Sequence, residues 1–269
     1  MPLFDLIRPA ALKLPIVISV PHAGTDFPND IRAELKPSVL PPDDTDWSVN
    51  QLYDFATELG IPMLCARYSR WVIDLNRNPD STPLYHDGRV LTGLCPATNF
   101  LGEPIYQDGR AAVAAEEVAR RKTLYFEPYH QALHQLLDET KAQFGCVLLW
   151  DCHSIRRLVP AINPEPFPDL ILGSADETSA APTLIGRAMA VLGSGGYSLN
   201  HNHPFKGGFI TRHFGQPARQ QHALQLEMAK QVYMNDQEQH YNEQRAAKIR
   251  ALLSQTLQAL GRELLAGPQ

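Results

Sequence analysis

The sequence contains no Cys-x-x-Cys pair, because its four cysteines, Cys65, Cys95, Cys146 and Cys152, are scattered along the chain. A disulfide framework is not expected in a chain of 269 residues that shows no secretion signal. The first residues include no basic segment that leads into the apolar core of a signal peptide. We therefore expect no disulfide framework and a cytoplasmic location.

Excess positive charge and long apolar runs are also lacking. The chain has 24 Lys and Arg against 29 Asp and Glu, a formal net charge of −5, which argues against nucleic acid as a partner. Its apolar runs are far shorter than a membrane span, so no membrane association is expected. Internal repeats, low-complexity tracts and linkers are missing too, and residues 1–269 are predicted to form one domain.

Short apolar runs alternate along the chain with segments of helical periodicity. The runs predict strands over residues 16–20, 62–66, 71–74, 147–150, 169–173 and 222–228. Helices are predicted over 47–59, 110–144, 182–191 and 242–265, with Pro128 as a kink or break, and a long ordered loop from Asn78 to about Gly109. This alternation predicts the α/β class, with a single mixed, mostly parallel sheet covered by helices on both faces.

Two of the apolar runs lead into a histidine. The run Cys146-Val-Leu-Leu-Trp is followed by Asp151 and His153, and the run Pro15-Ile-Val-Ile-Ser-Val by His22. Open α/β sheets bind ligands at the carboxyl ends of their strands, where an imidazole on a rigid strand is a good metal ligand. Asp151 is near enough to orient His153. Either histidine alone is explained as an ordinary polar strand end, but the pair favours a metal site.

A third ligand is needed, because zinc in a hydrolase takes three protein ligands and leaves a position for water. Asp44 and Asp46 are the candidate carboxylates. Both also stand where cap residues of the helix beginning near Trp47 are expected. Capping alone is therefore the competing interpretation, and it is stronger for Asp44 than for Asp46.

Glu227 is a candidate general base, because it lies in the apolar-leaning strand Ala223-Leu-Gln-Leu-Glu-Met228. A carboxylate there is costly to bury without a partner, and beside an activated water it would accept a proton. A solvent-facing edge position is the alternative, which the alternation with Gln225 permits. Cys152 adjoins His153 but is expected to face away from it, since neighbours on a strand point to opposite faces.

Cationic and amide side chains suggest a small anionic substrate. Asn76 and Arg77 follow a predicted strand, Arg70 lies just upstream, and Lys206 and Arg212 lie in a Gly-rich segment. Arginine binds carboxylates through its planar, two-pronged guanidinium group, which makes it the preferred partner for such a substrate. The competing interpretation is solvation at the surface, the usual fate of Arg and Lys.

Taken together, these segments resemble the N-formylglutamate amidohydrolase (N-formylglutamate deformylase) family. The resemblance rests on Val20-Pro-His-Ala-Gly24, Asp44-Thr-Asp-Trp47, Ser69-Arg-Trp-Val-Ile-Asp-Leu-Asn-Arg77, Asp151-Cys-His-Ser154, Phe205-Lys-Gly-Gly208 and Leu224-Gln-Leu-Glu227, and extends from about residue 15 to 230. The family is similar in plan to zinc carboxypeptidases and aspartoacylase, which implies a zinc-carboxypeptidase-like (phosphorylase/hydrolase-like) fold. Those enzymes place a Glu three residues after the first His, where this sequence has Thr25.

The resemblance implies a hydrolase of histidine degradation that converts N-formyl-L-glutamate and water to L-glutamate and formate. It implies Zn²⁺, or another divalent metal, on His22, Asp46 and His153. Further implied are Glu227 as base and Arg70 as oxyanion partner, and substrate binding by Asn76, Arg77, Lys206 and Arg212. Two alternatives are another zinc-dependent N-acyl amino acid hydrolase of the aspartoacylase type, and a non-catalytic module that binds acidic amino acids. The oligomeric state, the physiological metal and the pairing of each cation with a substrate carboxylate stay open.

Overall fold

Strand β2 (Ile16–Val20) illustrates how an apolar run becomes the centre of a sheet. All five residues are buried, with Ile16 and Ile18 in the core on one face of the sheet and Val17 in the core on the other. Successive side chains of a strand point to opposite faces, so a run that is apolar throughout must be covered on both sides. The predicted strand over 16–20 is confirmed.

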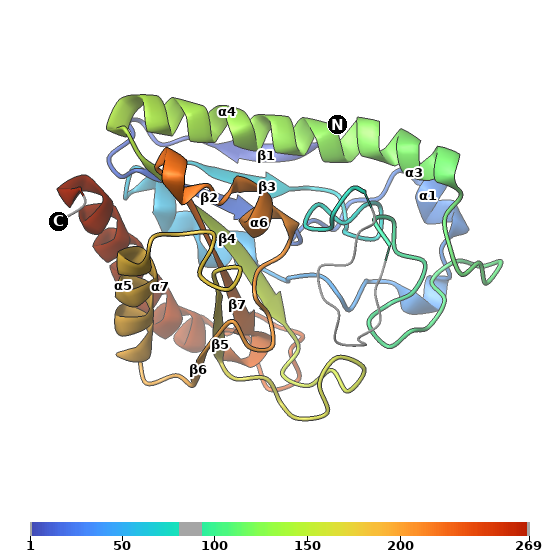
Figure 1. Cartoon of the computed structure of the whole chain (residues 1–269). Coiled ribbons are helices and arrows are strands. Elements are labelled where there is room, and N and C mark those ends of the chain that lie inside the picture. The colour runs from blue at the N-terminus through green and yellow to red at the C-terminus, as the bar shows by residue number, and fades with distance from the viewer. Residues whose placement is uncertain (1, 81–92, 268–269) are drawn as a thin grey trace.

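Within residues 2–80 and 93–267, which the computed structural model describes, seven strands form one mixed sheet (Figure 1). Their order is β1-β3-β2-β4-β7-β5-β6. The four central strands β3, β2, β4 and β7 are parallel, β1 and β5 run antiparallel to their neighbours β3 and β7, and β6 is parallel to β5. Besides β2, the strands are β1 (Phe4–Ile7), β3 (Met63–Ala66), β4 (Val147–Ile155), β5 (Leu170–Gly173), β6 (Leu199–His201) and β7 (Gln221–Ala229).

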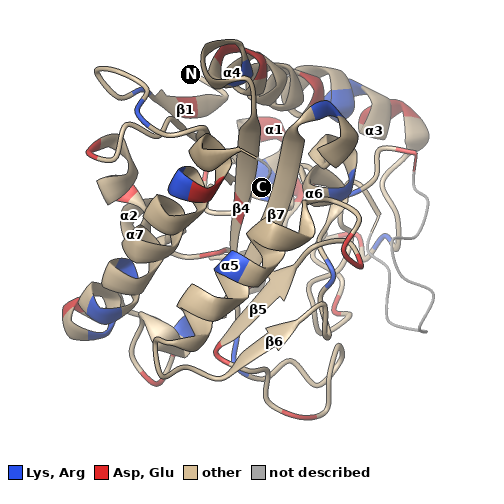
Figure 2. Cartoon of the chain, turned by 60° about the vertical axis from the view of Figure 1, so that its left-hand side comes forward, with Lys and Arg blue, Asp and Glu red and all other residues tan. Residues whose placement is uncertain are grey.

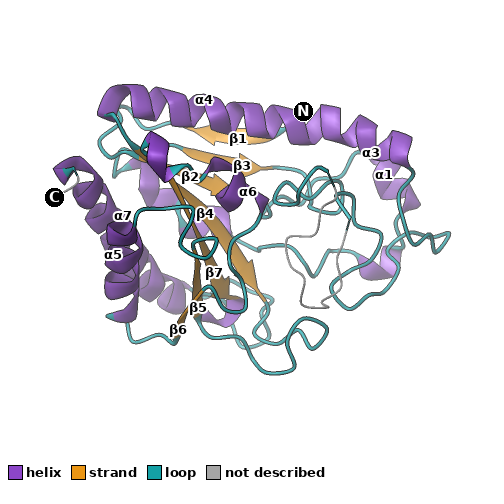
Figure 3. Cartoon of the chain, in the orientation of Figure 1, coloured by secondary structure: helices purple, strands orange, loops and turns teal. Residues whose placement is uncertain are grey.

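Helices cover both faces of this sheet, as predicted (Figure 3). One core lies between the sheet and α4 and α6, and the other lies between the sheet and α2, α5 and α7. Long loops gather beyond the carboxyl ends of β3 and β4 (Figure 3). The helices are α1 (Asn29–Glu34), α2 (Val49–Leu52), α3 (Ala115–Arg121), α4 (Glu127–Phe144), α5 (Pro182–Gly193), α6 (Phe209–Phe214) and α7 (Glu243–Ala266).

The predicted helical region over 110–144 forms α3 and α4, with a π-helical turn over Lys122–Phe126 between them. Pro128 is the second residue of α4, which follows the π-helical turn directly. The backbone stays helical through Phe126 and Glu127, so no break is present at Pro128, and the irregularity in this region is the π-helical turn before the proline. Figure 1 shows the three segments following one another along a single edge of the molecule.

Three sequence-based boundaries were wrong. Residues 71–74 form turns instead of a strand, although they are buried. The helix predicted over 47–59 is reduced to α2 and a 3₁₀ turn over Asp54–Thr57. β4 does not end at Trp150, because it pairs with β7 along its whole length, from Val147 opposite Gln221 to Ile155 opposite Ala229. Of the predicted loop from Asn78 to Gly109, residues 81–92 lie outside the described residues.

Charged residues of both signs are interspersed along the helices in the view of Figure 2. Among the described ranges, no helix combines the length and the apolar character that crossing a bilayer requires. The four cysteines are buried as free thiols.

Candidate active site

Strand β4 carries His153 and Asp151 on the same face of the sheet. The alternate residues, Trp150 and Cys152, belong to the opposite core with α2, α5 and α7. Cys152 therefore faces away from His153, as predicted, and burial raises the pKa of its thiol well above the ordinary value. A thiol that is so hard to ionise is a poor nucleophile.

His22, Asp46 and His153 form a buried candidate metal-binding group, with one potential ligand atom from each lying within 4.8 Å of the others. The Asp46 Oδ2 atom is 3.8 Å from His22 Nδ1 and 3.2 Å from His153 Nδ1. The backbone also ties these residues together, since the amide of Asp46 donates to the carbonyl of His22 at 3.0 Å.

Asp44 takes no part in this group. Its carboxylate accepts hydrogen bonds from the indole Nε1 of Trp71 at 3.0 Å and from the backbone N–H of Phe100 at 3.3 Å. It thereby joins two loops that lie far apart in the sequence. The geometry favours Asp46 over Asp44 as the carboxylate that faces the two histidines.

A second carboxylate lies behind each histidine. His22 Nε2 is 2.8 Å from Asp74 Oδ1, and His153 Nε2 is 2.9 Å from Asp151 Oδ2. Because a carboxylate only accepts, these contacts favour a proton on each Nε2 atom and leave Nδ1 as the ring nitrogen that faces Asp46. Metal-binding histidines in proteins are commonly oriented in this way.

The polar atoms and charges of this group fit a divalent cation. His22 Nδ1 is buried, and none of the described residues donates a hydrogen bond to it or accepts one from it. An orphaned buried nitrogen is costly, and a cation would satisfy it. Burial, with Arg70 nearby, lowers the pKa of His22, which keeps the imidazole neutral as a metal ligand must be.

His153 has the opposite tendency. Burial alone would lower its pKa, but the carboxylates of Asp151 and Asp46 outweigh burial and hold the pKa well above the ordinary value. The site therefore has an excess of buried negative charge that a proton or a metal ion would balance.

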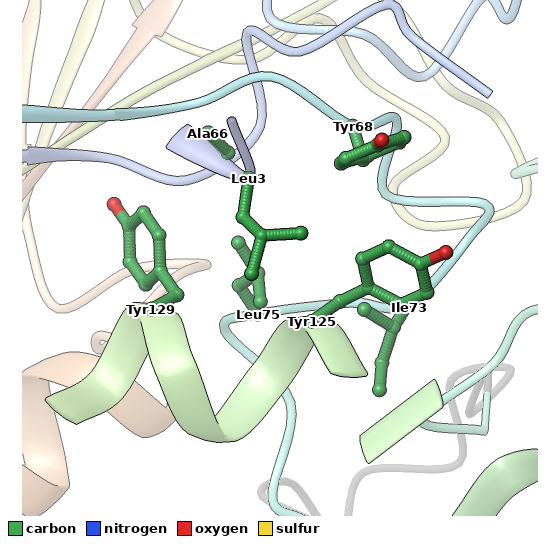
Figure 4. A pocket seen from close by; sticks show the side chains of 7 residues that line it. All are labelled: Leu3, Ala66, Tyr68, Ile73, Leu75, Tyr125 and Tyr129. Carbon is green, nitrogen blue, oxygen red and sulfur yellow. The ribbon is translucent and has the colours of Figure 1, made fainter. Parts of the chain in front are cut away.

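Asp74 connects His22 to two arginines. Its Oδ2 accepts from Arg70 at 2.7 Å and lies 3.5 Å from a guanidinium nitrogen of Arg77, while its Oδ1 faces His22. The neighbouring side chains Ile73 and Leu75 line a small apolar pocket between the N-terminal segment, β3 and α4 (Figure 4). The two residues that flank Asp74 in the sequence are thus anchored in the apolar interior.

Arg70 is buried beside these carboxylates, and its guanidinium carbon lies 4.9 Å from the centre of the Phe100 ring. Burial alone would lower its pKa, but the charges of Asp74 and Asp46 more than offset this and raise it, so the side chain stays cationic.

The amide of Asn76 is engaged by neighbouring protein groups. Its Nδ2 is 3.2 Å from Asp151 Oδ2 and 2.9 Å from His153 Nε2, and its Oδ1 accepts from the backbone N–H of Ile210 at 2.7 Å. A Cβ atom at Gly208 would overlap this amide, which explains the glycine there. Its role in substrate binding stays a prediction, and its observed contacts join the 70–77 segment to β4 and α6.

Glu227 lies directly opposite His153 on the neighbouring strand β7. Since β7 pairs with β4 on one side and β5 on the other, the alternative of an edge position is wrong. Burial raises the pKa of the Glu227 carboxylate to about 8. The residue as a whole is of intermediate exposure. Gln225, two residues earlier, places its Nε2 3.5 Å from Glu227 Oε2.

The remaining predicted substrate-binding residues are spread more widely. Arg77 lies 3.5 Å from the carboxylate of Asp74, which also contacts His22. Arg212, in α6, donates from Nε to the carbonyl of Gly207 at 3.0 Å. Lys206 is exposed and pairs with Asp176 at 2.9 Å.

Sequence reasoning missed two participants. No role was predicted for Asp74 beyond its place in a strand-end motif. Its position four residues after Arg70 could have suggested an ion pair between the two. The hydroxyl pair of Ser154 and Tyr233, with oxygens 2.7 Å apart, gave no sequence signal, because the two residues are 79 positions apart.

The fold and this arrangement define an α/β protein with a buried candidate metal centre at the carboxyl end of its central parallel strands. The model of the N-formylglutamate amidohydrolase family matches residues 14–234 of the chain. The chain therefore belongs to the N-formylglutamate amidohydrolase family.

Relatives of known name agree with this assignment. N-formylglutamate deformylase of Pseudomonas putida is 44% identical over 250 residues, which cover 92% of each chain. The enzyme of the same name from Pseudomonas aeruginosa is 43% identical and covers 93% of this chain and 95% of its own. The crystal structure of N-formylglutamate amidohydrolase from Ralstonia eutropha is 30% identical, with a TM-score of 0.78 over 98% of this chain and 99% of that one.

Proposed function

We propose that the chain hydrolyses N-formyl-L-glutamate to L-glutamate and formate, using a divalent metal ion held by His22, Asp46 and His153. The observation that carries the proposal is the convergence of two imidazole Nδ1 atoms and one carboxylate in a buried space, with a further carboxylate behind each ring. Two nitrogens and one oxygen are a known donor set of catalytic zinc sites. The names of the relatives supply the substrate.

A metal ion bound there would supply Lewis acidity, polarising the formyl oxygen and making a water molecule easier to deprotonate. Glu227 is the group that accepts the proton of the attacking water and passes it to the departing glutamate nitrogen. Its position opposite His153 on the neighbouring strand supports this role. Arg70 stabilises the negative charge that develops on the formyl oxygen.

The formyl group is small, so selectivity must come from the glutamate half of the substrate. Arg77, Arg212 and Asn76 bind its two carboxylates, with Lys206 contributing from the same segment as Arg212. Pairing of guanidinium and carboxylate groups is directional as well as strong, and it favours a substrate with two carboxylates over one with a neutral side chain.

Product analysis tests this proposal. Purified protein incubated with N-formyl-L-glutamate should release formate and L-glutamate in equal amounts, and N-acetyl-L-glutamate should be a poor substrate. Faster turnover of the acetyl compound would instead support an aspartoacylase-like hydrolase. Tight binding of N-formyl-L-glutamate without product, in a sample that contains metal, would support a binding module.

A further inference from the structure

A buried lysine and a buried tyrosine just after β7 contact both ends of the loop that carries Asp46. Lys230 is 2% exposed and Tyr233 is 0% exposed. Lys230 Nζ donates to the carbonyl of Asp43 at 3.0 Å, and the Tyr233 hydroxyl donates to the carbonyl of Trp47 at 2.8 Å. The two accepting carbonyls therefore bracket residues 44–46.

Tyr233 also reaches Asp46 through Ser154. The hydroxyl oxygens of Tyr233 and Ser154 are 2.7 Å apart. Tyr233 has one hydroxyl proton, and the carbonyl of Trp47 can only accept, so the Ser154 hydroxyl is the donor to Tyr233. The backbone N–H of Ser154 in turn donates to Asp46 Oδ2 at 3.2 Å. A continuous chain of hydrogen bonds thus runs from Trp47 through Tyr233 and Ser154 to the Asp46 carboxylate.

Lys230 is an unusual choice for a buried position. Lysine is almost never fully buried without a partner, and an apolar side chain of the same length would cost less to bury. Its ammonium group meets a backbone carbonyl close to the charges of Asp46, Asp43 and Glu238. A lysine at this position is therefore better explained by its hydrogen bond to the Asp43 carbonyl than by core packing.

We propose that Lys230 and Tyr233 are positioning residues, which hold the 44–46 loop so that the Asp46 carboxylate faces His22 and His153. Strand β7 carries Glu227 three residues before Lys230 and leads directly into these anchors. Strand β7 thereby positions the proposed base directly and, through Lys230 and Tyr233, the proposed carboxylate ligand. The inference rests on the proposed metal site and adds two residues that touch neither metal nor substrate.

The experiment compares Lys230→Met and Tyr233→Phe with a matched control, Tyr129→Phe. Tyr129 is also buried and donates its hydroxyl to a backbone carbonyl, that of Leu64 at 3.2 Å, but it does not contact the 44–46 loop. For each protein, zinc affinity is measured by competition with a chromophoric chelator, and metal-free stability by urea unfolding. Turnover of N-formyl-L-glutamate is measured in zinc-buffered solutions.

We expect Lys230→Met and Tyr233→Phe each to weaken zinc binding by about tenfold, the lower end of the range for groups that support metal ligands. Turnover should recover as free zinc is raised, with KM little changed, because Asp46 and the arginines are intact. Tyr129→Phe should lower stability without changing zinc affinity.

Zinc affinities equal to the wild type in both variants would overturn the inference while leaving the proposed function intact. A wild-type protein that binds no zinc, and whose turnover needs none, would overturn the metal proposal and this inference together. Equal losses of affinity in all three variants would show a general effect of core damage and would also overturn it.

Discussion

The substitution Asp74→Asn should damage the candidate site more than the same substitution at Asp151. Asp74 is 1% exposed, and its two oxygens receive His22, the backbone N–H of Asn76, and Arg70. Asparagine keeps one accepting oxygen but presents an amide NH₂ in place of the other. If the oxygen stays with His22, the buried guanidinium of Arg70 loses its carboxylate at 2.7 Å.

The magnitude follows from these contacts. Removing one partner of a buried ion pair costs roughly 3–5 kcal/mol, because the other charge stays buried and uncompensated. Asp151 accepts from His153 and Asn76, and its Oδ1 has no hydrogen-bond partner among the described residues. Its charged partner is His153, which can release its proton when the carboxylate is lost, whereas Arg70 cannot. We therefore expect Asp151→Asn to cost only about 1–3 kcal/mol, the scale of a lost buried hydrogen bond.

Urea unfolding of the metal-free proteins at pH 7 measures this difference. Both variants should also weaken zinc binding by roughly 10–100-fold, since each loses the carboxylate behind one histidine. Asp74→Asn should also raise KM, because Asp74 contacts Arg70 and Arg77. An Asp74→Asn protein within about 1 kcal/mol of the wild type would refute the reasoning, since even an ordinary hydrogen bond is worth that much.

Three further changes test other parts of the account. Glu227→Gln should keep the bound metal and lower turnover by roughly a hundredfold or more, and near-normal turnover with metal present would exclude Glu227 as the base. Arg212→Ala should reduce kcat/KM for N-formylglutamate more than for N-formylmethionine, and the difference should correspond to on the order of 1.5–3 kcal/mol. An unchanged ratio of the two kcat/KM values would show that Arg212 does not recognise the side-chain carboxylate. Burial lowers the pKa of His130 from 6.5 to about 3, so its neutral form stabilises the fold above pH 6.5, and this stability is lost as the pH falls towards 3. As the pH falls from 6 to 4, the free energy of unfolding of His130→Gln should therefore decrease less steeply than that of the wild type, by about 1.4 kcal/mol per pH unit. Equal slopes for the two proteins would contradict a lowered pKa of His130.

The central strands and the long helices could be predicted from the sequence because their periodicity reports burial directly. Strands β2, β4 and β7 and helices α5 and α7 follow from apolar runs and helical spacing. Residues 71–74 misled the prediction, because Trp71 is buried in a small core with Leu35 and Tyr106, without strand pairing. Apolar composition alone does not distinguish these two ways of being buried.

The candidate site was predictable where it lies at or near the carboxyl ends of predicted strands. His22 and His153 come from adjacent parallel strands, and Glu227 from the next strand, so the sheet brings them together. The contact of Asp74 with His22 was not predictable, because it joins residues 52 positions apart through a loop. The engagement of the Asn76 amide by β4 and α6 likewise depends on tertiary packing that no local pattern reports.

Metal content measured alongside formate release shows whether the proposed hydrolysis depends on a bound metal ion. Metal analysis and formate assays with N-formyl-L-glutamate are run on the same samples of wild type and His22→Ala, before chelation, after chelation and after zinc is returned. We predict about one divalent ion per wild-type chain, formate release that disappears and returns with the metal, and neither in His22→Ala. Full formate release by wild-type protein that has been stripped of metal would contradict the account.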